Sequence, residues 1–531
     1  MNPKLKTAAR RSAIIIGGLV ILTALFYAEE NWRGRRAWEN CQHEWEAKGE
    51  RLNWQSVVPP RVPDDQNFAL TPIVYSSYGQ ILTRDGKAIP FEKRDTNFVN
   101  RLKMDIYFDV PAELRPTNEF GSWTKSTKTD LKIWQRFYRT AANPTNGIKT
   151  TPQPQTPAAD VLLALSKYDS TVEELRAAAK LPYSRFPLDY DTDCPAAILL
   201  PQLSGIKQCG LLLTLRIFAE LQNGQEEKAV DDAKLSLRLM DSLHNESFLI
   251  SHLVRMAIFQ ITINSIYEGL AEHRWSDTQL AALDTELQKM DFLADWQTSM
   301  HGERAGNVAI VDWLRQCNKK DYSNMLGNTD GNGLWFLVKC APAGWLEQTK
   351  VWLCNFYTNL NAVANLNTKT MQPAAARQVD LVLNRECSRV TPCNLLGKIL
   401  LPAFGSAAKR FAYVQATADL ARTACALERY RLAHGEYPEM LATLAPQFIA
   451  QLPHDIIGGQ PLHYRRTSDG RFVLYSIGWN EKDDGGVVVF RKNSSTAVDT
   501  EKGDWVLQYP VKYLTTKAQS HQEFLPLRLG R

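Results

Sequence analysis

The stretch ALERYRLAHGEYPEMLATLAPQFIAQLPHDIIGGQPLHYRRTSDGRFVLYSIGWNEKDDGG occupies residues 426–486 and predicts a helix followed by antiparallel strands. An alanine-rich helix runs into it and ends at Gly435, where glycine suits a left-handed cap. Two strand-like runs follow, over 461–466 and 471–477, and the TSDG between them is typical of a hairpin turn. The stretch closes on Asp483-Asp484-Gly485-Gly486, a carboxylate pair on a turn.

The order of these signals is long helix, HGxYP, P-x-D, GxPLxY, a strand ending in YSIG, and an acidic glycine turn. In this order, from Phe411 to Pro510, the chain resembles the C-terminal half of the major pseudopilin of type II secretion. The resemblance implies a small α+β module, over 411–515, with a three-stranded antiparallel sheet. The start MNPKLKTAARRSAIII has no prepilin-peptidase site, and Asp455-Ile456-Ile457-Gly458 replaces the family's D-P-W-G. We therefore expect a borrowed module and not a filament subunit.

The N-terminus carries a membrane signal. Lys4, Lys6, Arg10 and Arg11 precede an uncharged, mostly apolar run over 12–28, which at about 1.5 Å per residue is near the short limit for a span. A cleavable signal peptide is the competing interpretation, but bulky residues before Ala28 give no A-x-A site. The positive-inside rule places residues 1–11 in the cytoplasm, so we expect a single-pass anchor in the inner (cytoplasmic) membrane with everything after it in the periplasm or at the cell exterior. A soluble protein with a buried N-terminal helix is the alternative.

The remaining chain divides by composition. Residues 29–141 predict a mixed segment, with helices over 29–49 and 130–140 and a few edge strands over 73–110. Residues 142–157 are polar and proline-rich and predict a linker. Residues 158–410 predict an α-helical body of packed hairpins, and residues 516–531 a tail. The expected fold class is therefore mainly α, with one transmembrane helix and a small C-terminal α+β domain.

Composition limits the classes of function. At 531 residues, two or three domains are expected. The net charge of +5 comes from 62 basic and 57 acidic residues spread along the chain, so no clustered basic face favours nucleic-acid binding. The nine cysteines are scattered without a CxxC pair; Cys387 with Cys393, or Cys340 with Cys354, are close enough in sequence to bridge, but spacing does not decide between them.

Calcium is the one cofactor that the pseudopilin resemblance implies. Major pseudopilins bind calcium in the loop after the YSxG strand, where this chain has Asn480, Asp483 and Asp484, followed by Asp499 and Asp504. Calcium prefers carboxylate and carbonyl oxygens on a flexible loop. Asn480 stands where the family usually has an aspartate, which removes one charge. A solvated Asp-Asp-Gly-Gly turn without metal is the competing interpretation.

Catalytic motifs give little support for an enzyme. His301 and Glu303 are candidates for acid–base chemistry, although a structural role is favoured. Two S-x-x-K matches, at Ser122 to Lys125 and Ser406 to Lys409, lack the partner motifs of penicillin-binding proteins, and His434 is expected to cap the long helix.

The whole chain also resembles large bacterial membrane-anchored envelope proteins of no assigned activity, through PDDQNFALTP at Pro63, RFPLDY at Arg185 and ALERYRLAHGEYP at Ala426. The leading hypothesis is therefore an exported, membrane-anchored protein of structural or protein-interaction type, which binds other envelope proteins. The alternative is an exported hydrolase with its site between the helical body and the C-terminal module.

Overall fold

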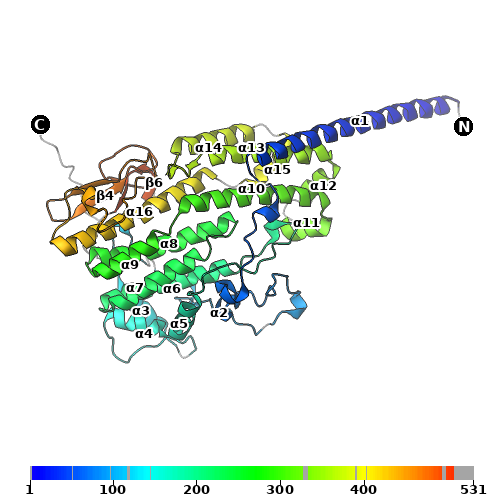
Figure 1. The fold of residues 1–531 in the computed structure, drawn as a ribbon. Helices are drawn as coiled ribbons and strands as arrows, with labels where there is room; N and C mark the ends of the chain where they lie inside the picture. Colours follow the sequence, from blue (N-terminus) through cyan, green and yellow to red (C-terminus); the bar gives the residue numbers. More distant parts are fainter. Residues whose placement is uncertain are drawn as a thin grey trace.

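The computed structural model describes residues 3–507 apart from 51, 96, 117–119, 144, 327–332, 389–390, 402–403 and 493–497. The expected tail over 516–531 and the end of the expected module from 508 lie outside the described residues. Helices dominate, and the small antiparallel sheets gather near the C-terminal end of the described chain (Figure 1). The expected fold class, mainly α with a small C-terminal α+β region, is confirmed.

Helix α1 covers Pro3–Ala47 without a break, joining the expected anchor and the expected helix after it into one element. Its first half projects away from the body (Figure 1), and the apolar side chains from Ile14 to Phe26 are exposed. Its second half lies against α13 (Ala343–Asn361) and buries Trp38, Cys41 and Trp45. Length and composition thus make the N-terminal helix a candidate membrane span.

The helical body follows the hairpin pattern expected from sequence. Helix α6 (Gln202–Gln222) ends at Asn223-Gly224 and packs on α7 (Glu226–Asp241) and on α8 (Leu249–Ala271). Helix α8 is also long and apolar enough to span a membrane, but it is mostly buried in the protein and is a core helix. The remaining helices of this part are α3 Leu131–Ala141, α4 Pro157–Leu165, α5 Asp169–Ala178 and α9 Asp277–Leu287.

Three further long helices connect the body to both ends of the chain. Helix α10 (Phe292–Gln316) lies within the expected α-helical body but was not predicted as an individual helix; it contacts α13 and α16 (Phe404–His434). Helix α16 ends at Gly435, whose φ of +82° is the expected left-handed cap. Shorter helices complete the described part: α11 Lys319–Leu326, α12 Gly333–Cys340, α14 Pro373–Ser388 and α15 Pro392–Leu400.

The C-terminal module contains the three-stranded antiparallel sheet expected for it. Its order is β3-β4-β7, formed by β3 His463–Arg466, β4 Phe472–Ser476 and β7 Trp505–Leu507. The TSDG turn closes β3 onto β4, with the Thr467 amide donating to the Arg471 carbonyl at 2.9 Å. A second hairpin, β5 Val488–Phe490 with β6 Val498–Gly503, lies between β4 and β7 in the chain, and β1 Ala364–Asn365 pairs with β2 Thr370–Met371 in the body.

The edge strands expected over 73–110 are wrong. The described residues there form helix α2 (Pro72–Tyr75), one 3-10 turn (η4, Phe91–Lys93) and one isolated bridge, between Leu82 and Ala88. The apolar side chains that suggested strands are buried instead against the helical body, as Leu102 is beside Gly205 of α6. The described residues of 142–156 form a loop, but α3 and α4 on either side of it pack together. One cluster of buried residues runs from Trp54 to Leu507, so the core is continuous across it.

Candidate functional site

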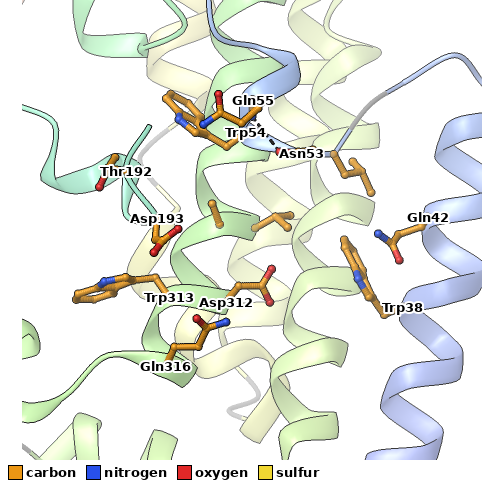
Figure 2. A pocket seen from close by; sticks show the side chains of 13 residues that line it. Trp38, Gln42, Asn53, Trp54, Gln55, Thr192, Asp193, Asp312, Trp313 and Gln316 are labelled. Atoms are coloured by element: carbon orange, nitrogen blue, oxygen red, sulfur yellow. Dashed lines mark hydrogen bonds between the residues drawn. The ribbon is translucent and has the colours of Figure 1, made fainter. Parts of the chain in front are cut away.

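A pocket of about 400 Å³ lies where the docked half of α1 meets α10 (Figure 2). Trp38 and Gln42 come from α1, and Asp312, Trp313 and Gln316 come from α10 at positions that share one side of a helix. The 3-10 turn η1 (Trp54–Ser56) and the loop at Thr192 and Asp193 close the remaining sides. Residues far apart in the sequence therefore form the walls; in Figure 2, Trp38 and Gln42 of α1 lie across the space from Asp312 of α10.

Fixed partners hold much of this wall in place. The Trp54 indole nitrogen and the Gln55 amide both donate to the Tyr190 carbonyl, at 3.1 and 2.9 Å. The Lys350 ammonium lies 4.4 Å from the centre of the Trp38 ring and 2.8 Å from Asp312 Oδ1. The Asp312 carboxylate at the pocket wall is therefore held in an ion pair with this ammonium.

A second pocket, of about 310 Å³, lies between the helical body and the C-terminal module. Asp419 of α16 lines it, and its carboxylate accepts from the Gln415 amide at 3.2 and 3.3 Å. Desolvation raises the pKa of Asp419 to about 7, against the opposing effects of the Gln415 hydrogen bond and Arg422. Lys369 and His454 line the same pocket; the Lys369 ammonium pairs with Asp291, and the His454 ring nitrogen Nε2 is 3.1 Å from the Lys369 carbonyl oxygen.

The acidic turn is organised around Asp504, at the entry to β7. This carboxylate is 1% exposed and accepts from the backbone amides of Asp484, Gly486 and Val487, at 3.2, 2.6 and 3.3 Å. Burial raises its pKa, and the three amide hydrogen bonds oppose that rise. The Asp504 carboxylate thus fixes the turn by accepting hydrogen bonds from several of its backbone amides, as a bound anion does.

The other expected calcium ligands face different partners. Asp483 accepts from the Gly485 amide and from the Tyr475 hydroxyl, at 2.9 and 3.0 Å, which together lower its pKa. The Asn480 amide donates to Asp484 Oδ2 at 2.7 Å, and Asp499 accepts from the Glu501 amide on β6. Within the described part of the chain, no group of three or more histidine, cysteine, aspartate or glutamate side chains is arranged to hold a metal ion. Calcium at this turn stays a prediction.

His301 and Glu303 lie on α10 and face different neighbours. Glu303 Oε1 accepts from the Leu249 amide at 3.0 Å and so caps the start of α8, and burial raises its pKa. The His301 ring nitrogen Nε2 lies 3.4 Å from Glu50 Oε1, just beyond the end of α1, and desolvation lowers the histidine pKa. Arg304 also binds Glu50. Glu303 therefore connects α10 to α8, and His301 connects α10 to the segment just after α1.

The other residues considered from sequence also have structural partners. The Ser122 hydroxyl lies 2.8 Å from the Thr124 hydroxyl, and the Lys409 ammonium pairs with Glu501. His434 Nδ1 is 3.0 Å from the Tyr430 carbonyl oxygen in the last turn of α16. Cys340 and Cys354 are both free thiols, and Cys354 is buried with Cys41 in the cluster between α1 and α13.

The first pocket was not predicted from the sequence, and for the second only its place between the helical body and the C-terminal module was suggested, because each is lined by residues from separate helices and loops. The signal that existed was indirect: 14 tryptophans, of which Trp38, Trp54 and Trp313 line the first pocket. Comparison with protein-family models, with curated proteins and with solved structures gives no match. The functional argument therefore depends on geometry and on the residues themselves.

Proposed function

We propose that this chain is an exported, membrane-anchored protein of structural or protein-interaction type, held by α1 in a cytoplasmic membrane with its bulk outside the cytoplasm. The observation that supports it is the continuity of α1, which passes from an exposed apolar half to a half buried against α13. Such a helix fixes the body at a constant height over the bilayer. The pseudopilin-like module then lies at the far end of the body from the anchor (Figure 1), where it is presented to other envelope proteins.

Cross-linking tests this proposal. A photoreactive residue at Met440, which is 63% exposed on the module, is compared with one at Tyr183, which is 46% exposed on the body. In native membranes we expect one reproducible protein adduct from position 440 and none from 183. Absence of an adduct at both positions, or equal adducts at both, would contradict a module that binds a specific partner.

A second candidate function, an exported hydrolase, is favoured by the pocket at Asp419. A carboxyl group with a pKa of about 7 is suited to proton transfer near neutral pH. The pocket also lies between the helical body and the C-terminal module, and ligand sites are common at such interfaces. The test is turnover of ester, phosphate, peptide and glycoside substrates by the full chain and by Asp419→Asn. Activity that Asp419→Asn loses without a change in melting temperature would support the hydrolase. Absence of turnover by the unaltered chain would count against it.

A further inference from the structure

The end of the body nearest the anchor carries an exposed apolar surface. Helix α12 buries Val338 against the body and exposes Phe336 and Leu337, by 62% and 58%. Trp32 of α1 is also exposed, by 63%. We call these three residues the collar. In Figure 1, α12 lies at the end of the body from which the first half of α1 projects.

Contacts between α1 and this end of the body set the height of the collar along the anchor. The Tyr27 hydroxyl donates to the Cys340 carbonyl at the end of α12, and the Phe26 ring meets the Trp345 ring edge-on at 6.1 Å. Tyr27 and Phe26 are the last aromatic residues of the apolar run, which ends at Ala28. The end of α12 therefore lies level with the end of the membrane span.

The connection between anchor and body is rigid. Gly34 of α1 and Gly344 of α13 are in backbone contact, because a Cβ built on Gly34 would lie 2.2 Å from the Gly344 carbonyl oxygen. The Gly344 amide donates to Asn31 Oδ1 at 2.9 Å, and the Trp345 indole donates to Glu30 Oε2 at 2.9 Å. No flexible linker separates the span from the body, so the collar takes the depth that α1 gives it.

The apolar run of α1 is short compared with the bilayer, which places the collar close to the lipid. At about 1.5 Å per residue, Ser12–Ala28 covers roughly 25 Å, which is shorter than the about 30 Å hydrocarbon core. A short span is accommodated by thinning of the bilayer and by flanking residues at the interface. Tryptophan, tyrosine and arginine are suited to that depth. Arg35 and Arg36 are exposed about two turns beyond the span, and the Arg36 guanidinium lies 5.5 Å from the Trp32 ring centre.

We propose that the collar is a lipid-contacting surface: Phe336, Leu337 and Trp32 enter the interface of the bilayer that α1 spans, while Arg35 and Arg36 face anionic headgroups. The body is then a monotopic as well as an anchored membrane domain. This inference rests on the membrane anchoring proposed above. It does not depend on the pseudopilin resemblance or on a protein partner.

The experiment measures the depth of single nitroxide labels on the full chain in vesicles of phosphatidylcholine and phosphatidylglycerol. Labels are placed by Phe336→Cys on the collar, Leu22→Cys in the span and Met440→Cys on the module. Cys340→Ser, Cys387→Ser and Cys393→Ser form the background, since the other free cysteines described are buried. At each site the collision rate with lipid-soluble oxygen is compared with that for a water-soluble nickel complex.

We expect positions 336 and 22 to favour oxygen over nickel several-fold more than position 440, which is equally exposed in the protein at 63%. A result at 336 that equals that at 440, with 22 in lipid, would overturn the collar and leave the anchor intact. A label at 22 that meets nickel freely would overturn the anchor and the collar together. Shielding of 336 from both reagents would show that a protein covers the collar, and would also overturn the proposal.

A second label, Leu337→Cys, guards against a local effect of the first substitution. Both variants are first required to unfold in detergent at the temperature of the background protein. Because the two side chains are exposed and neighbouring on α12, we expect the same lipid preference at 337. A nickel preference at 337 in a folded variant would contradict the proposed surface.

Discussion

The two halves of α1 have the same backbone conformation and opposite surroundings. Over 12–28 the side chains are mostly apolar and exposed; from Glu30 on, only one stripe is buried, and it carries Trp38, Cys41 and Trp45 at i, i+3 and i+7. A helix that is apolar all round suits lipid, whereas a striped helix suits one protein neighbour. The comparison teaches that the sequence period, and not the helix itself, determines whether each half meets lipid or protein.

The largest effect is expected where the docked half is in backbone contact with α13. Gly34→Leu places a side chain into the Gly344 backbone, which cannot move without displacing α13. Overpacking costs about 1–3 kcal/mol where side chains yield, and more where backbone must move, so we expect a loss of about 3 kcal/mol or more of unfolding free energy. Denaturant unfolding in detergent measures it.

The matched control is Gly17→Leu in the exposed half, where an added Cβ meets nothing within 4 Å. We expect no loss of stability there. Equal destabilisation by both substitutions would break the comparison, because it would mean that the two halves of α1 are packed alike.

A smaller effect is expected at the boundary between the halves. Glu30 is 7% exposed and accepts from Arg33 at 2.8 Å and from the Trp345 indole at 2.9 Å. Glu30→Ala leaves the indole N–H without this acceptor, which costs about 1–3 kcal/mol. Thermal unfolding should show the loss, whereas Glu29→Ala, at an exposed neighbour, should leave the midpoint unchanged. An unchanged midpoint for both would place Glu30 outside the docked interface.

Acid pH should loosen the docked half. Desolvation lowers the folded-state pKa of His301 below its ordinary value near 6.5, against the opposing effect of Glu50. The unfolded chain therefore takes up a proton first, so stability falls as pH drops below about 6.5 toward the folded-state pKa. His301→Gln should flatten this part of the stability–pH curve. A curve that keeps its slope in the variant would assign the pH dependence to another group.

Much of this architecture was accessible from sequence because it depends on local signals. Gly435 predicts the end of α16, and the TSDG turn predicts the register of β3 on β4, since both are set within a few residues. Asp455, from the P-x-D signal, accepts from the Ile457 and Ile477 amides and from Ser476, which ties its loop to the end of β4.

The failures have a common physical cause, which is tertiary context. The alternating residues of 73–110 predicted strands. In the structure their apolar side chains are buried against helices, and no neighbouring strand pairs with the described part of this segment. Helix α10 contacts helices on two sides, so its apolar residues are not confined to one stripe. Trp38 lines the same pocket as Trp54 and Trp313 because α1 docks on the body, and no local pattern predicts that arrangement.

The smallest effect is expected at the acidic turn, which lies at the far end of the body from α1. The Asp504 carboxylate already accepts hydrogen bonds from three backbone amides. The side chains left to act as calcium ligands are therefore chiefly Asn480, Asp483 and Asp484. Native-state binding raises stability by about 2.7 kcal/mol at a hundredfold excess over Kd; we expect a smaller shift here, seen as a modest rise in melting temperature over excess chelator. Asp484→Ala should abolish it, whereas Gly34→Leu should lower the melting temperature and leave the calcium increment unchanged. A calcium shift that survives Asp484→Ala would place the ion elsewhere, and no shift in the unaltered chain would make Asp483 and Asp484 a solvated turn held by Asp504 alone.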